Sequence, residues 1–210
     1  MRSATLFLLF GGLAVAGCAG HDESAERATV PAVRTWRQVA TPADRDRLSN
    51  WRTAFTQALA AARTSGNGPA IAGEGVLLDP DSAIDGAALP PSNYRCRVVK
   101  LGGRSTGMAD YVTYPAFACR VALTAEGTTL EKINGSQRPV GLLYPEDSRR
   151  QIFLGSMVLG DETMAMGYGR DPDRNMAGAV ERIGPTRWRL LLPRPQFESM
   201  MDVVELVPAA

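Results

Sequence analysis

The chain has 210 residues and carries 23 basic against 22 acidic side chains, a formal net charge of +1 at pH 7. Arg2 lies in an N-terminal segment that we expect to be removed, and without it the basic residues number 22, equal to the acidic ones. A neutral mature chain disfavours nucleic acid as a partner, which selects clustered positive charge. Arginine supplies most of the basic charge, and the only lysines are Lys100 and Lys132.

The N-terminus has the pattern of a secretory signal peptide over residues 1–17. Arg2 precedes an apolar run of about 14 residues, which is shorter than the roughly 20 that span a bilayer. The run ends in Val-Ala-Gly before Cys18, a pattern that resembles the lipobox of bacterial lipoproteins. The resemblance implies that Cys18 is diacylated and becomes the new N-terminus, and that Ala19 after it directs the protein to the periplasmic face of the outer membrane. The alternative is an ordinary signal peptide with a chance cysteine, which leaves the protein in the periplasm.

Residues 18–35 are polar, charged and interrupted by Pro31, which is typical of a flexible tether between a lipid anchor and a folded domain. The tether also holds His21, the only histidine of the chain. The remaining residues, 36–208, are enough for one domain with a core. That domain lacks Ser-His-Asp and Cys-His arrangements and the usual nitrogen ligands of zinc.

An amphipathic helix is predicted at the start of the domain. Thr41 is a good N-cap, Pro42 suits the first turn, and Asp44 complements the helix dipole. Apolar residues then recur at helical spacing until Ser-Gly-Asn-Gly-Pro, residues 65–69, which predicts the end of the helix. The apolar face comprises Leu48, Trp51, Phe55, Ala58, Leu59 and Ala62.

The rest of the domain predicts about ten short strands separated by turn signals. No segment between them is long enough for a helical crossover, so the sheet should be antiparallel. The predicted fold is therefore mainly β (α+β): an antiparallel meander that closes into a small barrel-like sheet, with the helix packed against it. The predicted strands are 75–78, 93–101, 114–123, 128–133, 139–144, 151–159, 164–168, 176–183, 187–192 and 201–207.

Cys96 and Cys119 form an even pair, which predicts a disulfide in an oxidising compartment. A hairpin that sets the two cysteines opposite each other also pairs Tyr94 with Val121 and Val98 with Phe117, and puts all six residues on one apolar, inward face. The same register places Arg95 opposite Arg120 on the other face.

Strand 151–159 is apolar on both faces, which predicts burial on both sides. One face should line the barrel, and the other should lie under the helix that contains Trp51.

One polar cluster is a candidate binding site, built from the ends of neighbouring strands: Arg138, Asp161, Glu162, Tyr168, Asp171 and Arg174. Paired carboxylates there could support acid–base chemistry, but salt-bridged turns are the simpler interpretation. The segment 171–175 has calcium-ligand spacing, but Met176 and Arg182 occupy the positions that need Gly and Glu, which excludes an EF-hand. We expect no catalytic residue, no metal and no cofactor.

Several strings in order, among them "WRQVATPADRDRLSNWRTAF", "YRCRVVKLG", "GSQRPVGLLYPE", "FLGSMVLGDE" and "RWRLLLPRPQFES", resemble the alphaproteobacterial family called domain of unknown function 4893. The resemblance runs from about Trp36 to Val207. It implies a small secreted or lipid-anchored domain, and it carries over no activity or catalytic residue.

These observations favour a lipid-anchored envelope protein, a non-catalytic binding or structural module whose partner is a protein or a small molecule, besides the membrane itself. Two alternatives stay open. One is a carboxylate-dependent hydrolase of envelope polymers that uses Asp161 or Asp171. The other is a protease or lysozyme inhibitor of barrel type, which would present loop 102–110 or loop 86–93.

Overall fold

The computed structural model describes residues 34–209, so the predicted signal peptide, Cys18 and most of the tether lie outside the described residues. The helices and helical turns are α1 (Trp36–Val39), α2 (Pro42–Ser49), α3 (Trp51–Ala62), η1 (Arg63–Asn67), α4 (Gly68–Gly73) and η2 (Gly75–Leu78). The strands are β1 (Ser92–Gly103), β2 (Tyr111–Thr113), β3 (Phe117–Thr124), β4 (Gly127–Lys132), β5 (Gln137–Pro145), β6 (Arg150–Leu159), β7 (Asn175–Gly184), β8 (Arg187–Pro193) and β9 (Ser199–Pro208).

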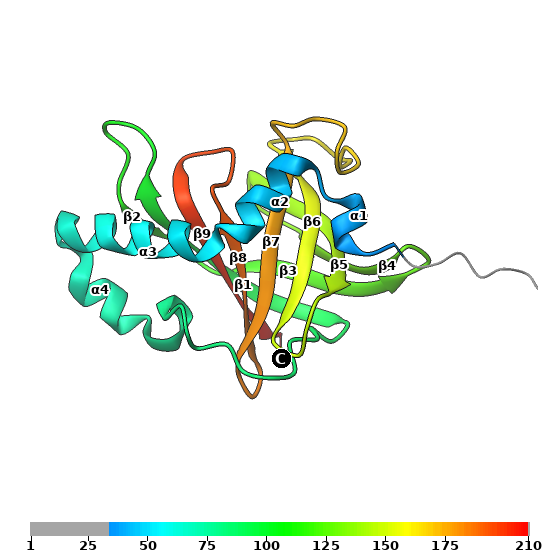
Figure 1. Ribbon diagram of the computed structural model, residues 1–210, viewed down its shortest axis with the longest axis horizontal. Helices are drawn as coiled ribbons and strands as arrows, with labels where there is room; N and C mark the ends of the chain where they lie inside the picture. The colour runs from blue at the N-terminus through cyan, green and yellow to red at the C-terminus, as the bar shows by residue number, and fades with distance from the viewer. Residues whose placement is uncertain (1–33, 210) are drawn as a thin grey trace, which may run out of the picture. The chain divides into compact units, whose positions relative to one another are not determined.

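The strands form a closed antiparallel barrel, as the sequence predicted (Figure 1). Strands β1, β3 and β4 to β9 follow one another around the barrel, and pairing of β1 with β9 closes it. The short strand β2 pairs with the last part of β1, beyond the five residue pairs that β1 makes with β3. Closure leaves no free sheet edge along most of the wall, which explains how a long meander avoids edge-to-edge association.

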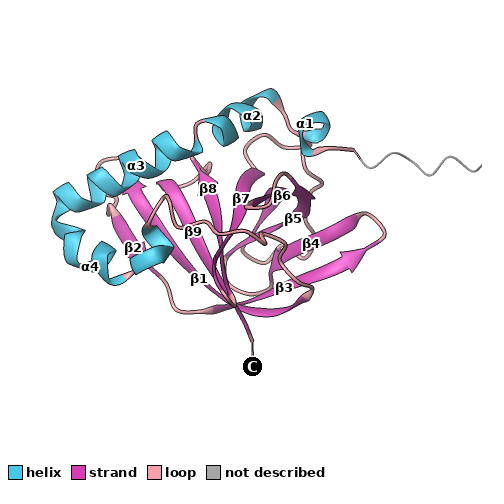
Figure 2. Cartoon of the chain, turned by 60° about the horizontal axis from the view of Figure 1, so that its bottom comes forward, coloured by secondary structure: helices cyan, strands magenta, loops and turns pink. Residues whose placement is uncertain are grey.

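The helices lie along one side of the barrel (Figure 2). The predicted N-cap is confirmed, because the Thr41 hydroxyl accepts a hydrogen bond from the Asp44 amide. The predicted single helix is wrong in extent: it breaks at Asn50 into α2 and α3. Helical structure also continues beyond α3, since Gly66 (φ 86°) turns the chain and Pro69 starts α4 rather than ending the helix.

Two predicted strands are wrong. Residues 75–78 form the helical turn η2, in which the neighbours Leu77 and Leu78 are both buried, an arrangement that a half-buried strand does not give. Residues 164–168 belong to the loop between β6 and β7, because these two strands pair directly with each other. The side chain of Met164 is 81% exposed there. The alternation of large and small residues in this segment is therefore not the pattern of a strand in a sheet.

The disulfide between Cys96 and Cys119 is confirmed, with the two Cα atoms 5.8 Å apart. The predicted register is wrong by two residues: Cys96 lies opposite Phe117, and Cys119 lies opposite Tyr94. The bridge therefore runs diagonally across β1 and β3, and a Cα separation of 5.8 Å is within the usual range for a disulfide. The inward face is confirmed, since both cysteines pack in the barrel core.

The register shift also changes the outer face of the same strands. Arg95 lies opposite Ala118, and Arg120 lies opposite Asn93, so the two arginines do not face each other. Arg120 instead pairs with Glu131 on β4. The predicted like-charge contact is therefore absent.

Strand β6 is buried on both faces, as predicted. Phe153 and Met157 point into the barrel core, while Ile152 and Leu154 pack outside it against Trp36 of α1. The expected cover by the helix that contains Trp51 is right only for the first part of that helix: Leu48 of α2 packs on β6 together with α1, whereas α3 packs on β1, β8 and β9.

None of the helices between residues 34 and 209 is both long and apolar enough to cross a bilayer.

Candidate functional site

A pocket of about 310 Å³ opens at the end of the barrel where β1, β6 and β8 end and β9 begins, which we call the open end. The pocket forms because β3 and β4 are short and the chain turns back after β4, so the barrel wall extends less far on that side. Its polar side chains are Lys100, Lys132, Ser136, Gln137, Glu198 and Asp202. Its apolar side chains include Val98, Phe117, Met157, Met176, Leu192 and Val204.

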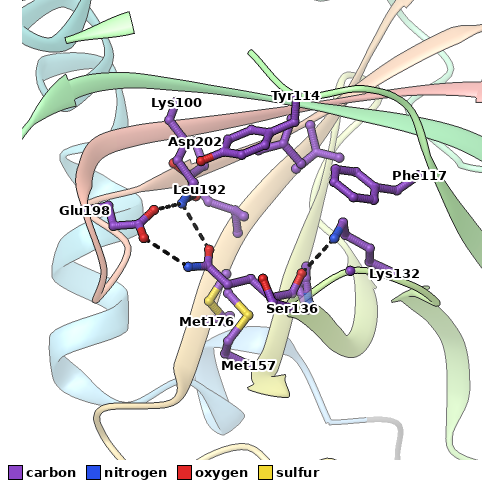
Figure 3. A pocket seen from close by; sticks show the side chains of 15 residues that line it. Lys100, Tyr114, Phe117, Lys132, Ser136, Met157, Met176, Leu192, Glu198 and Asp202 are labelled. Atoms are coloured by element: carbon purple, nitrogen blue, oxygen red, sulfur yellow. Dashed lines mark hydrogen bonds and ion pairs between the residues drawn. The ribbon is translucent and has the colours of Figure 1, made fainter. Parts of the chain in front are cut away.

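On one side of the pocket, Lys100 is held between two acids (Figure 3). Its ammonium nitrogen lies 2.9 Å from a carboxylate oxygen of Glu198 and 3.3 Å from one of Asp202. It also donates to the side-chain oxygen of Gln137 at 3.1 Å. Burial lowers the pKa of Lys100, but the two carboxylates together raise it above its ordinary value. Lys100 is therefore a cation with its counter-charges already in place.

On the other side, Lys132 has only neutral partners. Its ammonium donates to the backbone carbonyls of Asn134 at 2.8 Å and Gln137 at 2.9 Å, and it lies 3.6 Å from the ring centroid of Phe117. Lys132 forms no salt bridge with a carboxylate of residues 34–209. Burial, and then the positive charges of Arg138 and Lys100, lower the pKa of Lys132 to about 8. Lys132 is therefore a buried cation whose direct partners are all neutral groups.

The loops of the open end are hydrogen-bonded to one another around the pocket. The Arg104 amide donates to the Glu198 carbonyl at 3.0 Å, and the Gly160 amide donates to the Ser136 carbonyl at 2.9 Å. Glu198 itself holds a left-handed backbone (φ 67°), which is unfavourable for a residue other than glycine. Such a backbone persists where its surroundings hold it, and here the Glu198 carbonyl accepts from Arg104 while its carboxylate pairs with Lys100.

Three of the six residues in the predicted polar cluster come together beside the pocket. Arg174 pairs with both carboxylate oxygens of Glu162 at 3.0 Å. Arg138 donates to the backbone carbonyls of Gly135, Gly160 and Glu162 at 2.6–2.7 Å. These contacts tie the β4–β5 turn to the β6–β7 loop, and the three side chains stand outside the pocket lining.

The side chains of the other three residues of that cluster make different contacts. The hydroxyl of Tyr168 donates to Asp44 of α2, and burial followed by this contact raises the pKa of Tyr168 to about 12. Asp171 accepts from the Asp173 amide within its own turn, and Asp161 is exposed. The geometry therefore brings the side chains of Arg138, Glu162 and Arg174 together as a frame for the pocket, while the side chains of Asp161, Tyr168 and Asp171 take no part in these contacts.

The pocket residues themselves were missed by reasoning from the sequence. One signal for them was present: Lys100 and Lys132 continue the inward face of their strands, two residues after Val98 and Leu130. A lysine at an inward position is a departure from the apolar pattern, and departures of this kind mark functional positions.

A second hollow of about 330 Å³ lies outside the barrel between α1, the start of α3 and the β5–β6 turn. Its two cations are paired with acids, Arg37 with Glu146 and Arg150 with Glu181. Within residues 34–209, no group of three or more His, Cys, Asp and Glu side chains is placed to hold a metal ion.

Comparison with curated proteins and with solved structures yields no match. A family model described as a domain of unknown function, DUF4893, matches residues 36–206, which span the helices, the whole barrel and the pocket described above. The chain therefore belongs to the DUF4893 family.

Proposed function

We propose that this protein is a lipid-anchored binding module of the cell envelope, which holds a small molecule in the pocket at the open end of its barrel. The observation that carries the proposal is the pocket itself: a hollow within a closed barrel, lined by apolar walls and a few fixed polar groups. Small-ligand sites have this composition, and they occur in the mouths of β-barrels. A volume of about 310 Å³ is at the lower end of their usual range.

The barrel interior next to the pocket is closely packed. Below the pocket, next to Lys132, a void of about 10 Å³ is lined by core residues such as Phe153 and Leu190. That volume is about what one water molecule needs. The pocket thus ends on packed core residues of the barrel.

The pocket supports a binder better than a hydrolase. Its two acids, Glu198 and Asp202, both accept from Lys100, and Asp202 also accepts from the Ser199 hydroxyl. A general acid or base must be free to exchange a proton with substrate. The acids expected for a hydrolase, Asp161 and Asp171, lie outside the pocket lining.

The two loops expected for an inhibitor give that alternative little support. Segment 86–93 packs on the barrel, with Ala87 and Leu89 buried and the amides of Gly86 and Ala87 bonded to the Ser148 carbonyl. Loop 104–110 does extend from the open end (Figure 1), but Arg104 ties its base to the β8–β9 loop.

Methionine-methyl NMR tests the binding proposal, because Met157 and Met176 line the pocket while Met108 and Met164 are exposed elsewhere on the open end. A library of small amphipathic fragments is expected to contain members that shift the two pocket methyls selectively. Ser136→Trp should fill the pocket and abolish these shifts, and Ser105→Trp on a neighbouring loop is the matched control. A library without any member that moves the pocket methyls would refute the binding function.

The lipid anchor is a separate part of the proposal. It is supported by the sequence before Cys18 and by the polar stretch after it. Two or more acyl chains hold a protein firmly at a membrane, since each buried CH₂ contributes about 0.8 kcal/mol. Metabolic labelling with a palmitate analogue is expected to mark the wild-type protein, which should fractionate with outer membranes. Cys18→Ala should lose the label, and a labelled variant would contradict the assignment.

A further inference from the structure

We infer that the ligand is an amphiphile with a single anionic headgroup, which enters head first so that the headgroup pairs with Lys132 and the apolar chain points to the open end. This inference rests on the proposed binding function and adds the chemical class and the orientation of the ligand. Three observations carry it: the neutral partners of Lys132, the burial of the charged groups, and the exposed apolar side chains among the loops at the rim.

The two lysines of the pocket differ in their partners. Lys100 has Glu198 and Asp202 as direct partners, whereas Lys132 has two carbonyls and an aromatic ring. The two lysines and the two acids of the pocket carry no formal net charge together, so the distinctive feature of Lys132 is that no carboxylate of residues 34–209 contacts its ammonium. Buried charges in proteins are normally paired with an opposite charge. By contrast, the cations of the hollow outside the barrel are both paired. Lys132 is thus a buried cation whose counter-charge is missing from the described chain, and an anionic headgroup would supply it.

The depth of the charges sets the orientation. Lys132, Lys100 and Asp202 are only 5–7% exposed, and the void beneath Lys132 is too small for any ligand group. A headgroup at Lys132 therefore reaches the floor of the pocket, and the remainder of the molecule must extend outward. On its way it would pass Met157 and Met176, whose flexible thioethers adapt to irregular apolar ligands.

The rim carries several exposed apolar side chains among its charged ones. Five of the eight large hydrophobic side chains exposed among residues 34–209 lie in the connections at the open end, namely Met108, Tyr114, Ile133, Met164 and Met166. These connections belong to the ring of loops around the pocket. Grouped exposed apolar residues mark a binding surface. A chain that leaves the pocket would meet these apolar side chains.

The test compares three ligands with the same ten-carbon chain: sodium decanoate, 1-decanol and decyltrimethylammonium. Binding is measured by titration calorimetry on the folded protein and located by the methyl signals of Met157 and Met176. Decanoate is expected to bind at least about tenfold more tightly than decanol, the equivalent of one pKa unit of coupling, and the cation should bind most weakly. Shifts of the Met164 or Met166 methyl with decanoate would place the chain at the rim.

Lys132→Met removes the proposed partner and keeps an apolar stem of similar length. It should lower the affinity for decanoate at least about tenfold and leave decanol within about threefold of wild type. Arg120→Gln is the matched control, because it removes one positive charge from the neighbouring strand β3 at an exposed salt bridge. That variant should bind decanoate like wild type.

The wild-type protein offers a second arm if Lys132→Met fails to fold. The groups that face Lys132 are Arg138 on β5, Lys100 on β1, Glu198 and Asp202 beside Lys100, and the phenol of Tyr114. Since burial and the two cations place the pKa of Lys132 at about 8, the free protein loses this charge as pH rises beyond that value. Affinity for decanoate should then fall between pH 7 and pH 9.5, while affinity for decanol stays constant.

The outcomes separate the two proposals. If decanol binds in the pocket as tightly as decanoate, or if decanoate affinity is unchanged by both Lys132→Met and pH, the anionic class is refuted and the binding function stands. If no ten-carbon ligand shifts the pocket methyls but other fragments do, the amphiphile is refuted alone. If no fragment of any kind shifts them, the binding function falls as well.

Discussion

Arg189→Met is expected to lower the free energy of unfolding by about 3–5 kcal/mol, the range found when one partner of a buried ion pair is removed. Arg189 on β8 and Glu181 on β7 lie opposite each other in the sheet, and both side chains are fully buried. The guanidinium donates to one carboxylate oxygen of Glu181 at 2.7 and 3.0 Å. The variant would leave that carboxylate in the core with Arg150 as its remaining partner.

A second loss adds to the first, because Arg189 also anchors the helical layer to the barrel. One of its nitrogens donates to the carbonyls of Val76, Leu77 and Asp79, at 2.7–3.2 Å. These carbonyls end the turn η2, which no strand pairing holds in place. Methionine can replace the volume of the arginine stem but none of these donors, and unsatisfied buried carbonyls are costly.

Urea unfolding of the wild type and two variants decides the point. Arg187→Met is the matched control: it lies two residues away on the same strand and pairs with Glu205, but its side chain is 32% exposed, so its loss should cost only about 0–1 kcal/mol. The double variant Arg189→Met/Glu181→Met should recover part of the loss, because it removes the orphaned carboxylate as well. A single variant within 1 kcal/mol of wild type would show that Arg150 alone satisfies Glu181.

The barrel could be predicted because its strands obey a simple local rule. Inward apolar residues alternate with outward polar ones along β1 and β3, and turn signals such as Asn134-Gly135 separate the strands. Antiparallel order followed from the short connections. The same rule failed at residues 164–168, where alternation occurs in a loop, and at residues 75–78, where burial comes from the helical layer above.

The pocket could not be predicted in the same way, because it depends on where strands stop. The last part of β1 pairs with β2 and not with β3, and β4 ends at Lys132. Both features depend on the register between segments that are distant in the sequence. The polar cluster was sought at strand ends in the β6–β7 loop, and the residues there frame the pocket instead of lining it. Glu198 and Asp202 reach Lys100 from about a hundred residues away, a contact for which the local pattern holds no signal.

Removal of the disulfide is expected to cost roughly 3 kcal/mol, the chain-entropy value for a loop of 23 residues. The disulfide links β1 to β3, which pair with each other over only five residues before β1 pairs with β2 instead. The barrel wall has few strand hydrogen bonds at this point. The residues opposite the two cysteines on neighbouring strands include Phe117 and Lys132, so the bond also holds one side of the pocket.

Cys96→Ala/Cys119→Ala and the wild type should be unfolded in urea with and without dithiothreitol. The oxidised wild type should unfold at a higher urea concentration than the reduced wild type. The double variant should unfold at the same urea concentration with and without dithiothreitol. The variant should fall slightly below the reduced wild type, because both cysteines are buried and alanine leaves their sulfur volume empty. If dithiothreitol reduces the bond, as thiol mapping would show, and the wild-type transition stays in place, the disulfide contributes nothing and the short β1–β3 pairing is sufficient by itself.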